Sequence, residues 1–209
     1  VFLTNGIGAS HTTYGCINSH YFDPTKHLDG TKGFFRTKQA GRTGLGTVMK
    51  DKKIRAIVVL AEFPRGENPY GAADWGKVKQ AGAKLGGVIR EIDPQSLKMY
   101  RKGSAGLIAF MNKQEYQSLP VNNYQLGSDP RAERITGKFY AEHLFDHRGM
   151  DGCFPGCNLR CTKGGWVTLT FGKHKGRRVW VDGPEYETAA GFGSNIGMWN
   201  AEFIMEANW

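Results

Sequence analysis

The chain has 209 residues, a hydrophobic share of 40% and a formal net charge of +9, which suits a folded protein of one large domain or two small ones. It contains no run of roughly 18 apolar residues and no charged start ahead of an apolar core, which argues against a membrane span and a signal peptide. Three of its four cysteines crowd together, unlike the spread framework of a secreted disulfide protein, so we predict a cytoplasmic location.

The N-terminal part of the chain, residues 1–62, is rich in glycine, threonine and β-branched residues. It ends in a continuous apolar run at 54–60, which is typical of a buried strand. The composition then turns to proline, glycine and asparagine between 64 and 70, which indicates a boundary. We therefore predict two domains, at residues 1–62 and 63–209.

The second part of the chain carries mainly helical patterns. Residues 73–92 place apolar side chains at the three-to-four spacing of an amphipathic helix. Asp129 and Pro130 are typical of the N-cap and first residue of a helix over 129–145. Further helices are predicted at 105–116 and 186–209, and the two strands of a hairpin at 166–171 and 179–181.

Two stretches, at 50–55 and 173–178, hold the densest basic charge. A nucleic-acid-binding surface would usually interleave aromatic side chains with such charges. The first stretch precedes an apolar run, and the second lies at the predicted hairpin tip. Both are interpreted as solvated turns, and no nucleic-acid partner is predicted. A positive surface would also speed the encounter with an acidic electron carrier.

Glycines at positions 41, 44 and 46 precede a short stretch compatible with a helix. Such an arrangement lets backbone N–H groups face an anion. The pattern matches neither the Walker phosphate loop nor a dinucleotide-binding fingerprint. A tight strand-to-helix turn with a solvated Arg42 is the alternative interpretation.

The sequence spaces Cys153, Cys157 and Cys161 as C-x3-C-x3-C, and we call residues 153–161 the cysteine loop. Thiolates are soft ligands that favour iron–sulfur clusters, zinc or copper(I). Cubane clusters and structural zinc sites are usually bound by four protein ligands, so a fourth ligand is required here. Cys16, a histidine or a group outside this chain could supply it. A non-catalytic zinc- or cluster-binding module remains one alternative for the function.

Four segments in order resemble the tungsten-containing aldehyde ferredoxin oxidoreductase family. They are the Ala-Gly-Arg-Thr-Gly-Leu-Gly-Thr-Val-Met run at 40–49 with the apolar run after it, Leu-Pro-Val-Asn-Asn-Tyr-Gln at 119–125, the cysteine loop, and the stretch from Gly-Pro-Glu-Tyr-Glu-Thr at 183–188 to Glu-Ala-Asn at 206–208. The resemblance implies an α+β fold: the C-terminal part of a β-rich pterin-binding domain at 1–62, then a mainly helical domain with the cysteine loop and a β-hairpin.

The resemblance also implies two cofactors. One is a bis-pyranopterin that holds tungsten or molybdenum, with magnesium bridging its phosphates, and its contacts would be Lys38, Gln39, Gly41 and Arg42. The other is a [4Fe–4S] cluster bound by Cys153, Cys157 and Cys161. The family spacing is usually C-x2-C-x3-C, so Cys153 carries one extra residue here. The family's fourth cysteine lies downstream of Trp209, which leaves Cys16 as a small buried thiol.

Three glutamates match family positions. Glu187 matches the active-site glutamate, where a carboxylate would shuttle a proton, and Glu185 is a second candidate. A glutamate near a helix start is otherwise a partner of the helix dipole. Glu206 matches a glutamate of an interfacial iron site in some dimeric members. Trp209 replaces the histidine often found there, so we expect a solvated glutamate and no iron.

By this resemblance the chain is part of an enzyme that oxidises aldehydes to carboxylic acids and passes electrons to ferredoxin or an iron–sulfur partner subunit. An alternative is a relative of the active subunit that reduces aromatic acyl-CoA at low potential. The family is several times longer than this chain, so the remainder of the same enzyme is an expected partner. A homo-oligomer is also compatible with the family.

Overall fold

A computed structural model of the chain describes residues 2–23, 34–60, 72–92, 99–146, 157 and 159–209. The chain divides into two compact units, Val1–Ala73 and Asp74–Trp209. Both helices and small antiparallel sheets are present, which agrees with the predicted α+β class. No helix in the described ranges is both long enough and apolar enough to cross a membrane.

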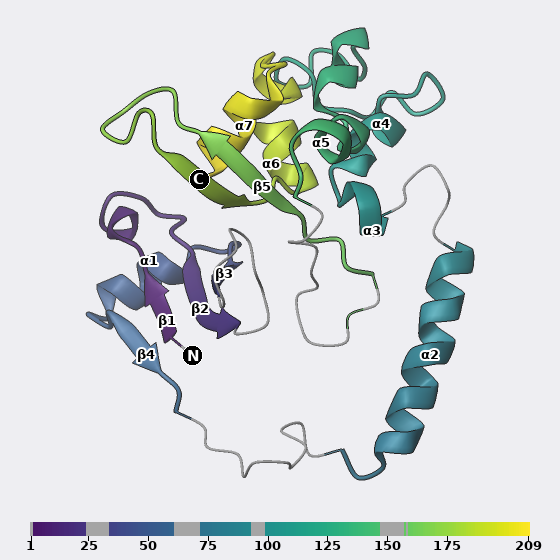
Figure 1. The fold of residues 1–209 in the computed structure, drawn as a ribbon. Helices are drawn as coiled ribbons and strands as arrows, with labels where there is room; N and C mark the ends of the chain where they lie inside the picture. The colour runs from purple at the N-terminus through teal and green to yellow at the C-terminus, as the bar shows by residue number, and fades with distance from the viewer. Residues whose placement is uncertain (1, 24–33, 61–71, 93–98, 147–156, 158) are drawn as a thin grey trace. The chain divides into compact units, whose positions relative to one another are not determined.

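The first unit is built on a four-stranded sheet with the order β3-β2-β1-β4 (Figure 1). Its strands are β1 (Phe2–Asn5), β2 (Ile17–Asp23), β3 (Phe34–Ala40) and β4 (Ala56–Val58), and every neighbouring pair is antiparallel. A short 3₁₀ helix, η1 (Ile7–Ser10), follows β1, and the helix α1 (Leu45–Asp51) packs against β1, β2 and η1.

The expectation of a buried strand at 54–60 was wrong. β4 covers only three residues and pairs with β1 at the edge of the sheet. Ile57 and Val58 are 47% and 51% exposed, and the rest of the run is exposed as well. An edge strand has a neighbour on one side only, and among the described residues no second layer covers it. An apolar run alone therefore did not determine burial.

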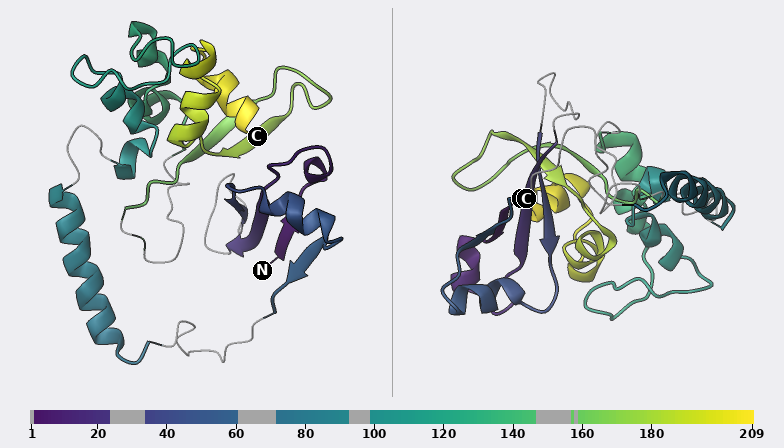
Figure 2. Two further views of the ribbon diagram at one scale, coloured as in Figure 1. Left: turned by 180° about the vertical axis from the view of Figure 1, so that it is seen from behind. Right: turned by 90° about the horizontal axis from the view of Figure 1, so that it is seen from below.

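The second unit contains most of the helices. Its elements, in order, are α2 (Trp75–Ile92), α3 (Met99–Lys102), α4 (Gly106–Met111), η2 (Pro130–Ile135), α5 (Gly137–His143), β5 (Gly164–Thr168), β6 (Arg178–Asp182), α6 (Tyr186–Gly191), η4 (Ser194–Ile196) and α7 (Ala201–Asn208). Strands β5 and β6 form the predicted hairpin, and α7 packs against both of them (Figure 2).

The helix predicted at 129–145 is two elements. Asp129 caps η2 by accepting a hydrogen bond from the Arg131 N–H, with Pro130 in the first turn as expected. Thr136 is extended and caps α5 by accepting a hydrogen bond from the Phe139 N–H. A second capping residue inside the predicted span therefore divides it.

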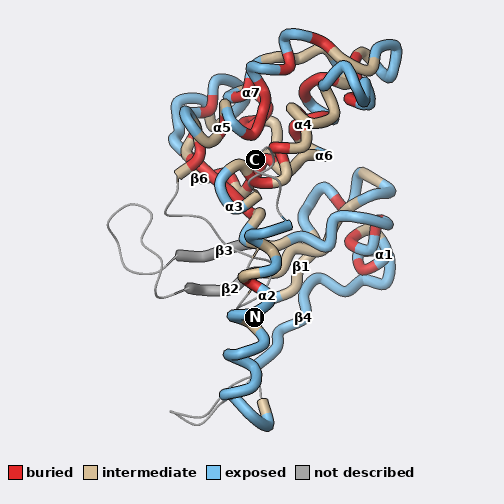
Figure 3. Tube along the Cα trace, turned by 90° about the vertical axis from the view of Figure 1, so that its right-hand side faces the viewer, coloured by how far each residue is buried: buried red, intermediate tan, exposed pale blue. Residues whose placement is uncertain are grey.

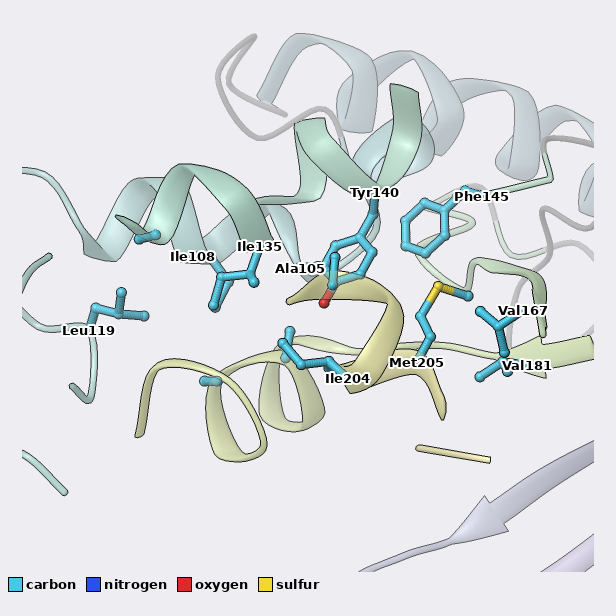
Figure 4. Packing of buried hydrophobic residues seen from close by; sticks show 14 of the residues in the cluster. Ala105, Ile108, Leu119, Ile135, Tyr140, Phe145, Val167, Val181, Ile204 and Met205 are labelled. Carbon is cyan, nitrogen blue, oxygen red and sulfur yellow. The ribbon is translucent and has the colours of Figure 1, made fainter. Parts of the chain in front are cut away.

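The core of the second unit lies between α4, η2, α5, α6, α7 and the hairpin. Tyr140 stacks on Phe145 with ring centroids 5.4 Å apart, and Ile204 and Met205 extend from α7 toward them (Figure 4). In Figure 3 the buried residues gather on these elements, whereas α2 is almost wholly exposed. Because Ala189 and Ala190 belong to this core, it holds α6 in place.

Candidate functional site

The cysteine loop precedes β5 in the chain, and the structure describes its residues 157 and 159–161. Cys157 and Cys161 are both half-buried, and Cys153 lies outside the described residues. Arg160, directly before Cys161, has a φ of 46°, so the chain turns sharply there. Of the described cysteines, Cys16, Cys157 and Cys161 form no disulfide. Two half-buried cysteines outside the helices and strands have the donor chemistry that an iron–sulfur cluster requires.

The described residues do not hold three or more metal-ligating side chains in one group. The two described thiols would therefore be part of a ligand set, which agrees with the need for further ligands noted from the sequence. Two thiols suit part of the ligand set of an iron–sulfur cluster, and Cys153, the third predicted ligand, lies outside the described ranges.

A buried lysine stands at the end of the cysteine loop. Lys163 is only 2% exposed, and its Nζ donates hydrogen bonds to the carbonyl oxygens of Arg160 and Thr162, the latter at 3.1 Å. Burial lowers the pKa of Lys163 to about 8, although the negative charges of Cys161 and Glu185 act in the opposite direction. The ammonium is therefore mainly charged at neutral pH.

Gly103, in the turn between α3 and α4, lies directly against this lysine. Its φ is +65°, and a Cβ there would lie 2.8 Å from Cγ of Lys163 and 2.9 Å from the carbonyl oxygen of Cys161. Both the left-handed backbone and the lack of space require glycine. The turn and the end of the cysteine loop are therefore in direct contact.

Ser104 joins the same turn to the start of α6. Its hydroxyl donates a hydrogen bond to the Glu185 carboxylate and accepts one from the Tyr186 N–H at 2.9 Å. Glu185 is thus fixed by Ser104, and its negative charge favours the charged form of Lys163. Glu187 lies in the first turn of α6 and is exposed. This position also suits a partner of the helix dipole.

The sequence analysis missed Lys163, Ser104 and Gly103. One feature of the sequence could have indicated Lys163: it is a charged residue between the cysteine loop and a predicted apolar strand. No such feature indicated Ser104, because its partners lie more than 80 positions away in the chain. Gly103 is one of 29 glycines and could not be singled out by type.

The residues expected to contact a pterin lie in the first unit, at the end of β3 and in the turn that follows. They are Lys38, Gln39, Gly41 and Arg42. Lys38 is half-buried and the other three are exposed. On β2, Ser19 pairs with Lys38 and Asn18 pairs with Gln39. A Cβ added at Gly41 would meet nothing within 4 Å, so the turn is open on that side.

The other two glycines of this run serve packing. A Cβ at Gly44 would lie 2.3 Å from the Thr13 carbonyl oxygen, and one at Gly46 would lie 2.1 Å from that of Cys16. The Gly46 N–H donates to the Gly15 carbonyl oxygen at 2.8 Å. The interpretation that all three glycines present N–H groups to an anion is therefore wrong for Gly46, whose N–H holds α1 against residues 13–16.

Glu206 differs from the solvated glutamate that the sequence suggested. It is 7% exposed, and its two carboxylate oxygens accept hydrogen bonds from the hydroxyl and N–H of Thr170 and from the N–H of Phe171, at 2.7, 2.7 and 3.2 Å. Burial opposes the charge, but these donors hold the pKa of Glu206 below its ordinary value. The carboxylate fastens α7 to the end of β5.

Comparison with known proteins assigns the sequence of the second unit to one family. A family model described as aldehyde ferredoxin oxidoreductase, domains 2 and 3, matches residues 80–209. The chain is 30% identical over 179 residues to a tungsten-containing aldehyde ferredoxin oxidoreductase of Pyrococcus abyssi. It is 28% identical over 172 residues to the proteins of the same description from Pyrococcus horikoshii and Thermococcus kodakarensis.

Each of these matches covers 82% of this chain and 25% of the relative. The cysteine loop, the hairpin and α6 all lie in the part that the family model matches. The chain is thus a portion of an oxidoreductase. It belongs to the aldehyde ferredoxin oxidoreductase family, and it spans about a quarter of the length of these relatives.

Proposed function

We propose that the chain is part of a tungstopterin and [4Fe–4S] oxidoreductase that oxidises aldehydes to carboxylic acids. The observation that carries the proposal is the α3–α4 turn, in which Gly103 lies against the Cys161 carbonyl oxygen and Ser104 is hydrogen-bonded to Glu185 and Tyr186. This turn links the cysteine loop to the first turn of α6, which bears Glu187. A cluster site and a candidate proton-transfer group thereby share one support in the second unit.

In the proposed reaction the aldehyde gains an oxygen atom from water and releases two electrons and two protons. Cys153, Cys157 and Cys161 would hold the cluster, which when bound would supply one-electron transfer toward ferredoxin or an iron–sulfur partner subunit. Glu187 takes up a proton as water attacks the carbonyl carbon and releases it to solvent.

In the first unit, Arg42 and Lys38 bind pterin phosphate. The Arg42 guanidinium offers a planar fork of N–H donors that matches two phosphate oxygens. Lys38 offers a point charge, and Gln39 adds an amide group beside it. Gly41 leaves the turn open to a ligand. Bound magnesium would supply charge neutralisation for the remaining phosphate oxygens. The rest of the enzyme completes both cofactor sites.

The test is aldehyde-dependent reduction of a viologen dye by the full-length protein, purified without oxygen. Glu187→Gln is expected to lower kcat by about 100-fold or more, the usual range for a lost general acid–base. Glu202→Gln is the matched control, because Glu202 is also exposed in the first turn of a helix, α7. It removes the same helix-dipole interaction and should leave kcat unchanged.

Equal effects of the two substitutions would contradict the role of Glu187. A wild-type enzyme that is inactive with aldehydes but reduces aromatic acyl-CoA would overturn the aldehyde proposal in favour of the acyl-CoA reductase alternative. Zinc as the only bound metal would overturn both and favour the binding module.

A further inference from the structure

Lys163 is a buried charge that the proposed reaction does not use. Its ammonium donates to two backbone carbonyl oxygens, one on each side of Cys161. A lysine side chain has four rotatable bonds, so its ordering is costly, and burial of its charge adds to that cost. A neutral apolar residue before the strand would avoid both costs. A lysine here therefore points to a need other than stability.

We infer that Lys163 is a positioning residue of the cluster: by tying the carbonyl oxygens of Arg160 and Thr162 together, it fixes the direction of Cys161 Sγ toward iron. The peptide groups that flank a residue set the direction of its Cα–Cβ bond. The ammonium holds the Arg160 carbonyl group, which belongs to the peptide directly before Cys161, and the Thr162 carbonyl group, which lies one peptide beyond that of Cys161, so it bridges the backbone across Cys161. This inference rests on the proposed function, because it assumes an iron–sulfur cluster at the loop.

The surroundings of Lys163 hold the ammonium in place. Gly103 packs against its side chain and against the Cys161 carbonyl group, and no larger residue fits there. The negative charge of Glu185, which favours the charged form of Lys163, is itself held in place by the hydrogen bond from Ser104. Gly103 in the α3–α4 turn therefore packs against the Lys163 side chain, and the negative charge of Glu185, directly before α6, favours the ammonium form of Lys163.

Residues behind the ligands of a metal site orient those ligands, and their loss typically lowers metal affinity by about 10- to 100-fold. Lys163 holds such a position relative to Cys161, because its ammonium donates hydrogen bonds to the backbone carbonyl oxygens of the residues before and after Cys161. Its removal should loosen the cluster and alter its spectrum. A residue that served stability alone would change neither in a protein that still folds.

The experiment uses the full-length holoenzyme, purified without oxygen, with four variants. Lys163→Met removes the donors, and Lys163→Arg keeps a cation with several N–H donors. Gly103→Ala keeps every charge but pushes on Lys163 and on the Cys161 carbonyl group. Lys138→Met is the control, because Lys138 is 66% exposed in the same unit. The measurements are iron per protein, the ferrous-chelator concentration that removes half of the iron, and the electron paramagnetic resonance spectrum of the reduced cluster.

We expect Lys163→Met to lose iron at a chelator concentration about 10- to 100-fold lower than the wild type. Lys163→Arg should restore most of the iron retention, Gly103→Ala should shift the spectrum, and Lys138→Met should match the wild type. If Lys163→Met does not fold, the electron paramagnetic resonance spectrum of Gly103→Ala tests the inference: a shifted spectrum supports it and a wild-type spectrum overturns it.

Wild-type iron retention and spectrum in both Lys163→Met and Gly103→Ala would overturn the inference while leaving the proposed function intact. Equal iron loss in Lys163→Met and Lys138→Met would overturn it as well, since a general charge effect would explain both. A wild-type protein without an iron–sulfur cluster would overturn the proposed function and this inference together.

Discussion

Replacement of Ser104 by alanine should release the first turn of α6 from the α3–α4 turn. The substitution removes an acceptor for the Tyr186 N–H and a donor to the Glu185 carboxylate. A hydrogen bond between neutral groups contributes about 0.5–1.5 kcal/mol, and one to a charged group about 1.5–3 kcal/mol. Because Glu185 is half-buried and water reaches part of it, a combined loss of about 2–3 kcal/mol is expected.

The assay measures the rate of hydrogen–deuterium exchange at the backbone amides of residues 185–191, by mass spectrometry of the full-length protein. A loss of about 2–3 kcal/mol in the local opening free energy corresponds to about 30- to 140-fold faster exchange. Ser118→Ala is the control, because Ser118 is exposed in a loop of the same unit. Unchanged exchange in Ser104→Ala, or an equal change in Ser118→Ala, would refute the claim that Ser104 anchors α6.

Two further substitutions test other parts of the structure. Glu206→Gln should lower the free energy of unfolding at neutral pH, because the folded-state pKa of Glu206 lies below its unfolded value. The difference from wild type, measured by urea unfolding, should disappear as the pH falls through that folded pKa; a difference independent of pH would contradict the charge-based role. Gly44→Ala should lower the thermal midpoint of unfolding, since alanine is strained at φ 69° and its Cβ would meet the Thr13 carbonyl oxygen. Gly41→Ala, which adds a Cβ in open space, should leave the midpoint nearly unchanged, and equal shifts would argue against this packing of α1.

Local patterns predicted part of the regular structure, whereas the helices expected at 129–145 and 186–209 are divided into two and three shorter elements. The apolar spacing of 73–92 corresponds to α2, and the alternation around a basic tip corresponds to the β5–β6 hairpin. Asp129 and Pro130 mark the start of η2, as their side-chain chemistry suggested. These features depend on residues a few positions apart, so a single sequence carries enough information to predict them.

Burial and long-range contacts could not be predicted in the same way. The apolar run that ends the first region became an exposed edge strand, because burial depends on which other segments cover it. The sequence suggested that Glu206 is a surface residue, because it does not show that Thr170, 36 positions earlier, donates hydrogen bonds to the Glu206 carboxylate. Lys163 was missed because its partners are backbone carbonyl groups, which no residue type reveals. The roles of Glu187 and of the pterin-contacting residues came from family resemblance.

The most direct test of the account is the metal content of the wild-type full-length protein, purified without oxygen and measured by elemental analysis. The account predicts tungsten or molybdenum together with about four iron atoms per cluster site, and a signal of a reduced [4Fe–4S] cluster that is lost or altered in Cys161→Ser. Stoichiometric zinc without iron, tungsten or molybdenum would contradict it.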